Sequence, residues 1–167
     1  MTSASKFKLS FFMIAIILVS CNHYDSIKTS GKESTSGGKS HNSGQDCMKC
    51  HHDNSSEASS SGTWWYFAGT AYNNDGTPAT SGKVELWSDS LAQATLIYSV
   101  PIDRNGNFFT SKIFDFKSGV YPKLVSSISS AHDAIMKPHL VSFNNASCNS
   151  CHGNNSDGTN QPKVKFK

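Results

Sequence analysis

The chain lacks several features that would place it at once in a large class of proteins. Its longest mostly apolar run, residues 9–19, is too short to cross a bilayer as a helix, which takes about 20 residues. Without residues 1–20 the charges nearly balance, with 13 basic and 12 acidic side chains. No basic stripe with interleaved aromatic residues occurs, so nothing favours a nucleic-acid partner. At 167 residues the chain holds one modest domain with tails rather than a large enzyme.

The N-terminus has the order of a secretory signal. Lys6 and Lys8 precede the apolar run, and a small residue, Ser20, comes directly before Cys21. The stretch LVSC at 18–21 resembles the lipobox of bacterial lipoproteins, in which the cysteine receives the lipid and becomes the new N-terminus. The resemblance implies that residues 1–20 are removed and that Cys21 anchors a body facing the periplasm or the cell exterior. An ordinary signal peptide or an uncleaved anchor is the alternative.

The other four cysteines occur in two copies of one pattern, CMKCH at 47–51 and CNSCH at 148–152. Two thiols three positions apart and a histidine directly after them is the spacing that attaches a c-type haem. The thiols add to the two haem vinyl groups, and the imidazole binds the iron. The sequence therefore predicts two covalent haem c groups, attached through Cys47, Cys50, Cys148 and Cys151, with His51 and His152 as proximal iron ligands.

Two other uses of paired cysteines stay open. Four-cysteine zinc ribbons also combine two CxxC knuckles, although those knuckles usually lie about 15–20 residues apart. Here nearly a hundred residues separate the pairs. A disulfide within each pair would suit an oxidising compartment. Neither alternative explains why a histidine follows both pairs.

The segments around the first motif are polar. Residues 21–45 are mostly Ser, Gly, Lys and Thr, so they cannot bury enough apolar surface to offset the entropy of ordering. We expect them to form a disordered, lipidated tether. The first haem segment, 46–62, ends in a second Ser-rich stretch.

Residues 63–130 change to short runs with alternating apolar positions, separated by turn signals such as NNDG at 73–76 and DRNGN at 103–107. A spacing of about 8–12 residues between turns predicts an antiparallel β-sandwich. The strand candidates are residues 64–72, 83–87, 95–100, 108–113 and 120–125.

Short motifs in this region resemble the carboxypeptidase-regulatory-like or transthyretin-like sandwich of bacterial surface proteins: FAGTAY at 67–72, DGTP at 75–78, GKVEL at 82–86, DxxGxF at 103–108 and SGVY at 118–121. That resemblance implies a scaffold or partner-binding module. The CxxCH pairs resemble class I and multihaem cytochromes c in the attachment motif alone, since the helical cytochrome body is absent. The expected fold class is mainly β: a transthyretin-like sandwich flanked by irregular or helical haem segments, 46–62 and 131–153, with a loose tail at 154–167.

A six-coordinate haem needs a second axial ligand, normally His or Met. Met48 and His52 are held beside the proximal histidine of their own motif, so they are poor candidates for their own haem. His23 and His41 fall in the expected tether. The ordered candidates for a distal ligand are His132, Met136 and His139.

Met136 and His139 are the preferred distal candidates for the second haem, because they closely precede its motif. His132 and Met136 would share one face if this segment formed a short helix ended by Pro138. Met136 could instead be a core residue, and His132 a surface histidine.

Together these features predict a lipid-anchored c-type cytochrome, with two haems, that exchanges electrons with redox partner proteins of the cell envelope and is not an enzyme. An alternative is a sandwich-based binding or sensing module with regulatory haem, which would need an exposed aromatic patch at Trp64, Trp65 and Trp87. A small haem peroxidase is disfavoured by the short chain and by its single arginine, Arg104, which is far from both motifs in the sequence.

Overall fold

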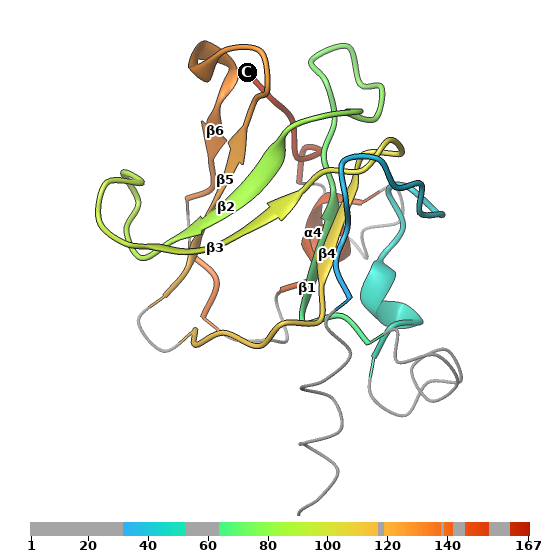
Figure 1. Cartoon of the computed structure of the whole chain (residues 1–167), viewed down its shortest axis with the longest axis horizontal. Coiled ribbons are helices and arrows are strands. Elements are labelled where there is room, and N and C mark those ends of the chain that lie inside the picture. The colour runs from blue at the N-terminus through green and yellow to red at the C-terminus, as the bar shows by residue number, and fades with distance from the viewer. Residues whose placement is uncertain (1–31, 53–63, 117–118, 138, 142–145, 154–160) are drawn as a thin grey trace, which may run out of the picture.

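A computed structural model describes residues 32–52, 64–116, 119–137, 139–141, 146–153 and 161–167 (Figure 1). The strands are β1 (Phe67–Thr70), β2 (Lys83–Trp87), β3 (Leu96–Pro101), β4 (Asn107–Thr110), β5 (Tyr121–Val125) and β6 (Ala134–Ile135). The helical turns are η1 (Cys47–Lys49), η2 (Ser130–His132) and α4 (Cys148–His152). The predicted mainly β, antiparallel class is confirmed. In these described ranges no helix is long and apolar enough to cross a membrane.

The strands form two antiparallel sheets. One contains β1 and β4, with Phe67 opposite Thr110 at one end of the pairing. The other has the order β3-β2-β5-β6. Its inner strands are β2 and β5, and Lys83 of β2 lies opposite Pro101 of β3 on one side and Val125 of β5 on the other. Each pairing is antiparallel.

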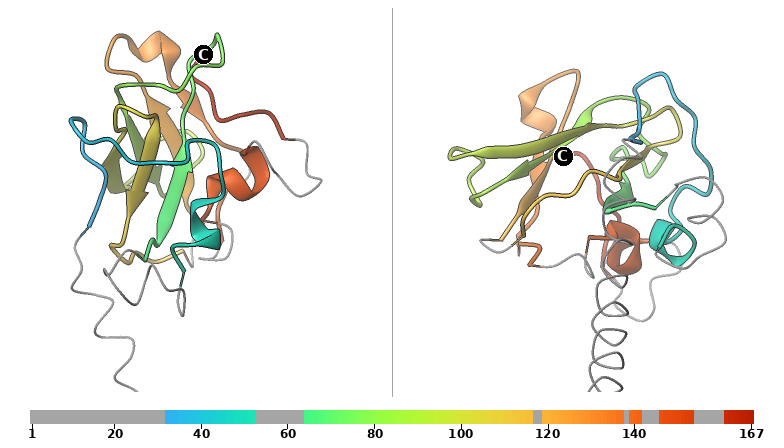
Figure 2. Two further views of the ribbon diagram at one scale, coloured as in Figure 1. Left: turned by 90° about the vertical axis from the view of Figure 1, so that its right-hand side faces the viewer. Right: turned by 60° about the horizontal axis from the view of Figure 1, so that its bottom comes forward.

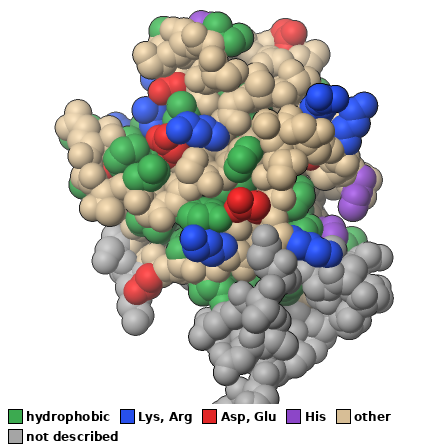
Figure 3. Space-filling view, viewed as in Figure 1, with side chains coloured by type: hydrophobic (Ala, Val, Ile, Leu, Met, Phe, Trp, Pro, Cys, Tyr) green, Lys and Arg blue, Asp and Glu red, His purple; other side chains and the backbone are tan. Residues whose placement is uncertain are grey.

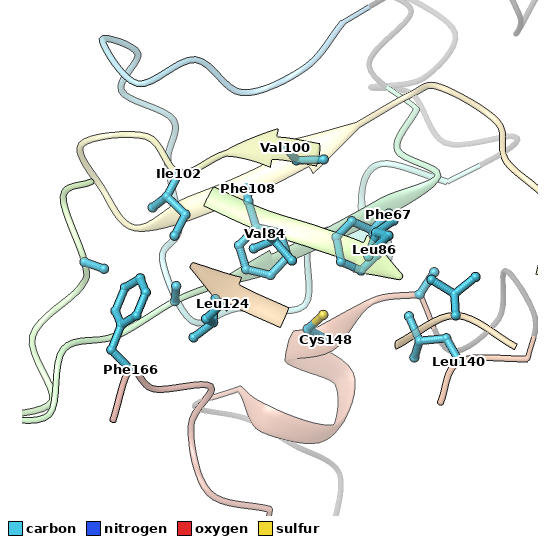
Figure 4. Packing of buried hydrophobic residues seen from close by; sticks show 14 of the residues in the cluster. Phe67, Val84, Leu86, Val100, Ile102, Phe108, Leu124, Leu140, Cys148 and Phe166 are labelled. Carbon is cyan, nitrogen blue, oxygen red and sulfur yellow. The ribbon is translucent and has the colours of Figure 1, made fainter. Parts of the chain in front are cut away.

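The core lies between these sheets. Alternation along β2 and β5 turns Val84, Leu86 and Leu124 inward. Phe67 of β1 and Phe108 of β4 meet them from the other sheet, with their ring centroids 5.3 Å apart. Figure 4 shows these side chains converging on one interior, with the sulfur of Cys148 beside them. The first cysteine of the second motif is therefore part of the hydrophobic core.

Residues 32–45, expected to belong to a disordered tether, are instead packed on the domain: 32–34 lie beside β4, and 38–43 lie against the turn between β3 and β4 (blue and teal in Figure 1). The backbone N–H of Ser34 donates to the Phe109 carbonyl (2.9 Å), and that of Ser40 donates to the Asp103 carboxylate (2.8 Å). The segment has few apolar residues to bury. It is ordered because it satisfies the open edge of β4 and the polar turn before it. Residues 21–31 lie outside the described part of the chain.

Part of the expected loose tail is also packed. Residues 161–167 run beside Tyr72, whose N–H donates to the Val164 carbonyl (2.8 Å) and whose carbonyl accepts from Phe166 (3.0 Å). The Phe166 ring is buried at the edge of the core (Figure 4). This single aromatic anchor explains why a polar tail docks, and it also brings Pro162 close to the second motif. Residues 154–160 lie outside the description.

The segment before the second motif is extended rather than helical. After η2, β6 pairs with β5, so that Ile135 lies opposite Lys123. The Lys123 ammonium lies 3.0 Å from the Asp133 carboxylate, which reinforces the pairing. The short helix considered for His132 and Met136 is therefore wrong, because pairing at the edge of the sheet satisfies this backbone instead.

Candidate haem-binding sites

The two cysteine motifs, nearly a hundred residues apart in the sequence, lie side by side in the structure (Figure 2). η1 and α4 both pack against β1. The Asn149 side-chain N–H of α4 donates to the Gln45 carbonyl (2.7 Å), just before η1. The Ser147 hydroxyl donates to the Asp46 carboxylate, which also accepts from the Met48 N–H as the cap of η1. The structure thus joins two sites whose relative positions the sequence could not predict.

A buried polar network fixes this junction. The Thr70 N–H donates to Asn149 Oδ1 (3.0 Å), and Asn149 Nδ2 donates back to Thr70 Oγ1 (2.9 Å). The same hydroxyl accepts from the Gly44 N–H (2.8 Å) and donates to Asn107 Oδ1 (2.6 Å). Asn149, Thr70 and Asn107 are almost fully buried, so these bonds replace water. Sequence analysis missed these residues, because the positions between the cysteines of a CxxCH motif carry no signal of such a role.

The first motif lines an open pocket of about 460 Å³. The tight turn at η1, closed by the His51 N–H donating to the Cys47 carbonyl (3.0 Å), brings Cys47, Cys50 and His51 to the same pocket. His51 is 8% exposed, and its ring centroid lies 5.0 Å from that of Trp65. The volume falls within the range of about 300–1,000 Å³ typical of small-ligand sites. Both thiols and the imidazole of the first motif are therefore available to one ligand.

The second motif starts in the core. The Ala68 N–H of β1 donates to the Ala146 carbonyl (3.1 Å), which places Cys148 against Gly69. A Cβ atom added to Gly69 would lie 2.7 Å from the Cys148 Cβ and 2.6 Å from the Phe108 ring. Glycine at this position is what allows α4 to approach β1 so closely.

A second pocket, of about 270 Å³, opens beside this core. Cys148 and His152 line it, together with Met136 and several apolar side chains of the four-stranded sheet. Cys151 is partly exposed and is not among the residues that line this pocket. The first thiol and the histidine of this motif therefore line the same pocket, and the second thiol lies nearer the surface.

The imidazole of His152 is oriented by the packed tail. Its Nδ1 lies 2.6 Å from the Pro162 carbonyl oxygen. A carbonyl can only accept, so Nδ1 carries the proton, and in the neutral ring Nε2 keeps its lone pair. Histidines that bind metals are commonly held in this tautomer by a carbonyl or carboxylate. The His152 imidazole is thus held in the tautomer that can bind iron through Nε2.

The first thiol of each motif is shielded from solvent, Cys148 almost completely and Cys47 in part. Burial raises the pKa of Cys47 to about 12, with a further contribution from the adjacent Asp46 carboxylate. It also raises the pKa of Cys148 to about 12, and the nearby thiols of Cys47 and Cys151 add to that shift. Both are protonated thiols at neutral pH and weak nucleophiles in the haem-free chain. The mutual effect of Cys47 and Cys148 also reflects how closely the two motifs approach.

The structure separates the three candidate distal ligands. Met136 is partly buried against the core and lines the second pocket together with His152. His139 instead packs on Tyr121, with ring centroids 5.1 Å apart, and His132 is exposed on η2. Neither of these histidines is among the residues lining the two pockets.

The tryptophans do not form the open aromatic patch considered for a binding module. Trp65 is buried and stacks on Phe109, with ring centroids 4.3 Å apart, while Trp64 and Trp87 are partly buried. Trp65 instead contributes a wall of the first pocket. The lipid-attachment candidate Cys21 lies outside the described residues.

The zinc and disulfide alternatives can be compared with the same geometry. Cys47, Cys50, Cys148 and Cys151 are free thiols. In the described ranges no three His, Cys, Asp or Glu side chains converge as a metal-binding group. The close approach of the two CxxC pairs nevertheless removes the separation along the chain as an argument against a shared site.

No family model, curated protein or solved structure matches the chain.

Proposed function

We propose that this protein is a lipid-anchored dihaem c-type cytochrome that carries electrons between redox partner proteins of the bacterial cell envelope. One observation carries the proposal: the two CxxCH motifs lie side by side, and each presents its first thiol and its histidine to a separate pocket. Two haem-attachment motifs that lie next to each other support a protein with two neighbouring redox centres.

The chain's own residues would divide the work as follows. Cys47 with Cys50, and Cys148 with Cys151, hold the two haems covalently. His51 and His152 bind iron, and the bond from His152 Nδ1 to the Pro162 carbonyl fixes the ring and raises the basicity of Nε2. When bound, each haem supplies a reversible one-electron couple. Met136 is the proposed distal ligand at the second motif.

Two further features support electron transfer rather than substrate chemistry. The contacts from Asn149 and Ser147 to the first motif hold the two sites together, which favours electron exchange within the molecule. Cys50 is exposed and Cys151 partly exposed, so a haem attached there would present an edge that a partner protein can approach. No residue is assigned a catalytic role.

The β domain would be the scaffold. We assign it to the transthyretin-like type on its glycine-and-turn motifs and two antiparallel sheets, and its outer surface is available to envelope partners. Lipid on Cys21 would keep this body at a membrane, in the periplasm or at the cell exterior.

The test is the intact mass and the reduced-minus-oxidised absorption spectrum of the protein matured in a host with c-haem attachment machinery. Two covalent haems with low-spin spectra support the proposal. Cys50→Ser and Cys151→Ser are matched variants at the more accessible thiols, and each should weaken attachment at its own motif only. A wild-type protein without covalent haem overturns the proposal.

A second candidate is a structural envelope protein stapled by zinc or by disulfides, favoured by the close approach of the two CxxC pairs. The same mass measurement separates the candidates. Bound zinc, or the loss of two protons from each cysteine pair, would support the stapled protein.

A further inference from the structure

The segment that carries His41 is held firmly beside the first pocket. The Ser40 N–H and hydroxyl both donate to Asp103 Oδ2 (2.8 and 2.5 Å). The Asn107 side-chain N–H donates to the His41 carbonyl (2.9 Å), and Asn105 donates to the Ser40 carbonyl. These bonds reach across more than sixty residues of sequence. They place the His41 backbone over the turn between β3 and β4, although the composition of the segment predicted disorder.

The His41 ring faces the proximal histidine of the first motif. Both rings line the same pocket as Cys47 and Cys50. Their centroids are 5.8 Å apart, with an angle of 42° between the ring planes. Metal–nitrogen bonds of about 2.0 Å would put the centroids of two axial imidazoles about 6 Å apart. The two rings therefore lie near enough for rotation of the exposed His41 side chain to bring both imidazoles to one metal ion.

Few side chains that line this pocket could act as a second iron ligand. Among the described residues that line it, His41 and His51 are the histidines, and no methionine contributes. His and Met are the usual partners of a proximal histidine in electron-transferring haems. His41 is exposed at the pocket, so its ring can turn toward a ligand without disturbing the core. The backbone is anchored and the ring is adjustable, as a distal ligand requires.

We propose that His41 is the second axial ligand of the iron at the first motif. This assignment rests on the proposed haem function and deepens it, because it makes the first centre a bis-histidine site while Met136 serves the second. Methionine raises the potential of a haem relative to histidine. The first haem would therefore have the lower reduction potential, and an electron shared by the two haems would reside mainly on the second.

The experiment compares His41→Ala with His132→Ala in protein matured with its haems. Both variants remove an exposed histidine, but His132 lies outside both pockets. We expect both to keep two covalent haems by intact mass. In His41→Ala one of the two irons should change from low to high spin, as seen by electron paramagnetic resonance, and added imidazole should restore it. His132→Ala should keep both irons low-spin.

His41→Met provides a second test of the assignment if His41→Ala fails to mature. It should keep two low-spin irons, add a near-infrared methionine–iron band, and raise the lower of the two potentials. A low-spin spectrum unchanged by His41→Ala, or changed equally by His132→Ala, overturns the His41 assignment alone. Wild-type protein without covalent haem overturns the proposed function as well, and the mass measurement reveals that outcome before any spectrum is compared.

Discussion

The two cysteine motifs share one pattern and have different surroundings. His51 lies on a tight turn, in a pocket lined mainly by polar residues of the segment that precedes it. His152 lies on α4 and opens onto a smaller pocket, which is lined by apolar side chains of β2, β5 and β6 and by residues 162–165 of the packed tail. The axial ligand, the polarity of the surroundings and the burial of a haem all change its reduction potential. Identical attachment chemistry on one small scaffold would therefore give two unequal centres.

The largest expected effect comes from breaking the packing of the second site. Gly69→Ala should lower the free energy of unfolding by about 3 kcal/mol, at the upper end of the cost of overpacking, because the new methyl would meet Cys148 and Phe108. Urea denaturation at constant m value measures the change. Gly37→Ala is the matched control, since no atom lies within 4 Å of its added Cβ. Equal stability of the two variants would show that α4 is not packed on β1 as described.

Removing the proposed distal ligand, Met136, tests whether the two haems have different axial ligands. Met136→Leu keeps an apolar side chain of similar size but removes the sulfur. The potential of one haem should fall by on the order of 100 mV, about 2.3 kcal/mol for one electron, and that haem should become high-spin. Potentiometric titration with optical detection measures both. Met48→Leu is the control, because Met48 lines neither pocket. An unchanged spectrum in Met136→Leu would make Met136 a core residue.

The sequence predicted what depends on local pattern. Alternating apolar positions at 83–87 and 95–100 became β2 and β3 with nearly the predicted bounds, because only one register buries their apolar face. The two attachment motifs were also recognisable from spacing alone. The hydrogen bonds that join the two motifs could not be predicted, since a bond such as the one from Asn149 to Gln45 joins positions 104 apart.

The same reasoning explains why the ordered segment 32–45 was mistaken for a tether. Composition measures how much apolar surface a segment can bury, and this segment buries little. Its order comes from hydrogen bonds to Asp103, Asn107 and β4, which are made only once those partners are folded. The proposed role of His41 therefore became apparent only from the structure.

A smaller effect is expected where the two motifs are joined. Asn149→Ala leaves the buried Thr70 N–H without its acceptor, which should cost about 1–2 kcal/mol of unfolding free energy. Although Asn149 lies in the second motif, amide hydrogen exchange should speed up at Gly44, near the first. Ser150→Ala, at the other position between the cysteines, loses two partly buried bonds within its own motif and its cap, to the Ser147 carbonyl and to Cys151 Sγ. If Gly44 exchanges at the same rate in both variants, the two sites are independent rather than joined.

The smallest effect concerns the haem-free chain at alkaline pH. Because burial raises the pKa of Cys148 from 9.0 to about 12, the unfolded thiol ionises before the folded one does. The contribution of this thiol to the free energy of unfolding is therefore nearly complete below about pH 8 and is lost as the pH rises toward 12, with about 1.4 kcal/mol lost at pH 10. Cys148→Ala should make this fall shallower in denaturation curves taken between pH 8 and 10, leaving the part that is due to Cys47, whereas Ser150→Ala should leave the whole fall intact. Cys47, whose pKa is also about 12, should behave like Cys148. An equally steep fall in Cys148→Ala would mean that its thiol is not held in the core before haem is attached.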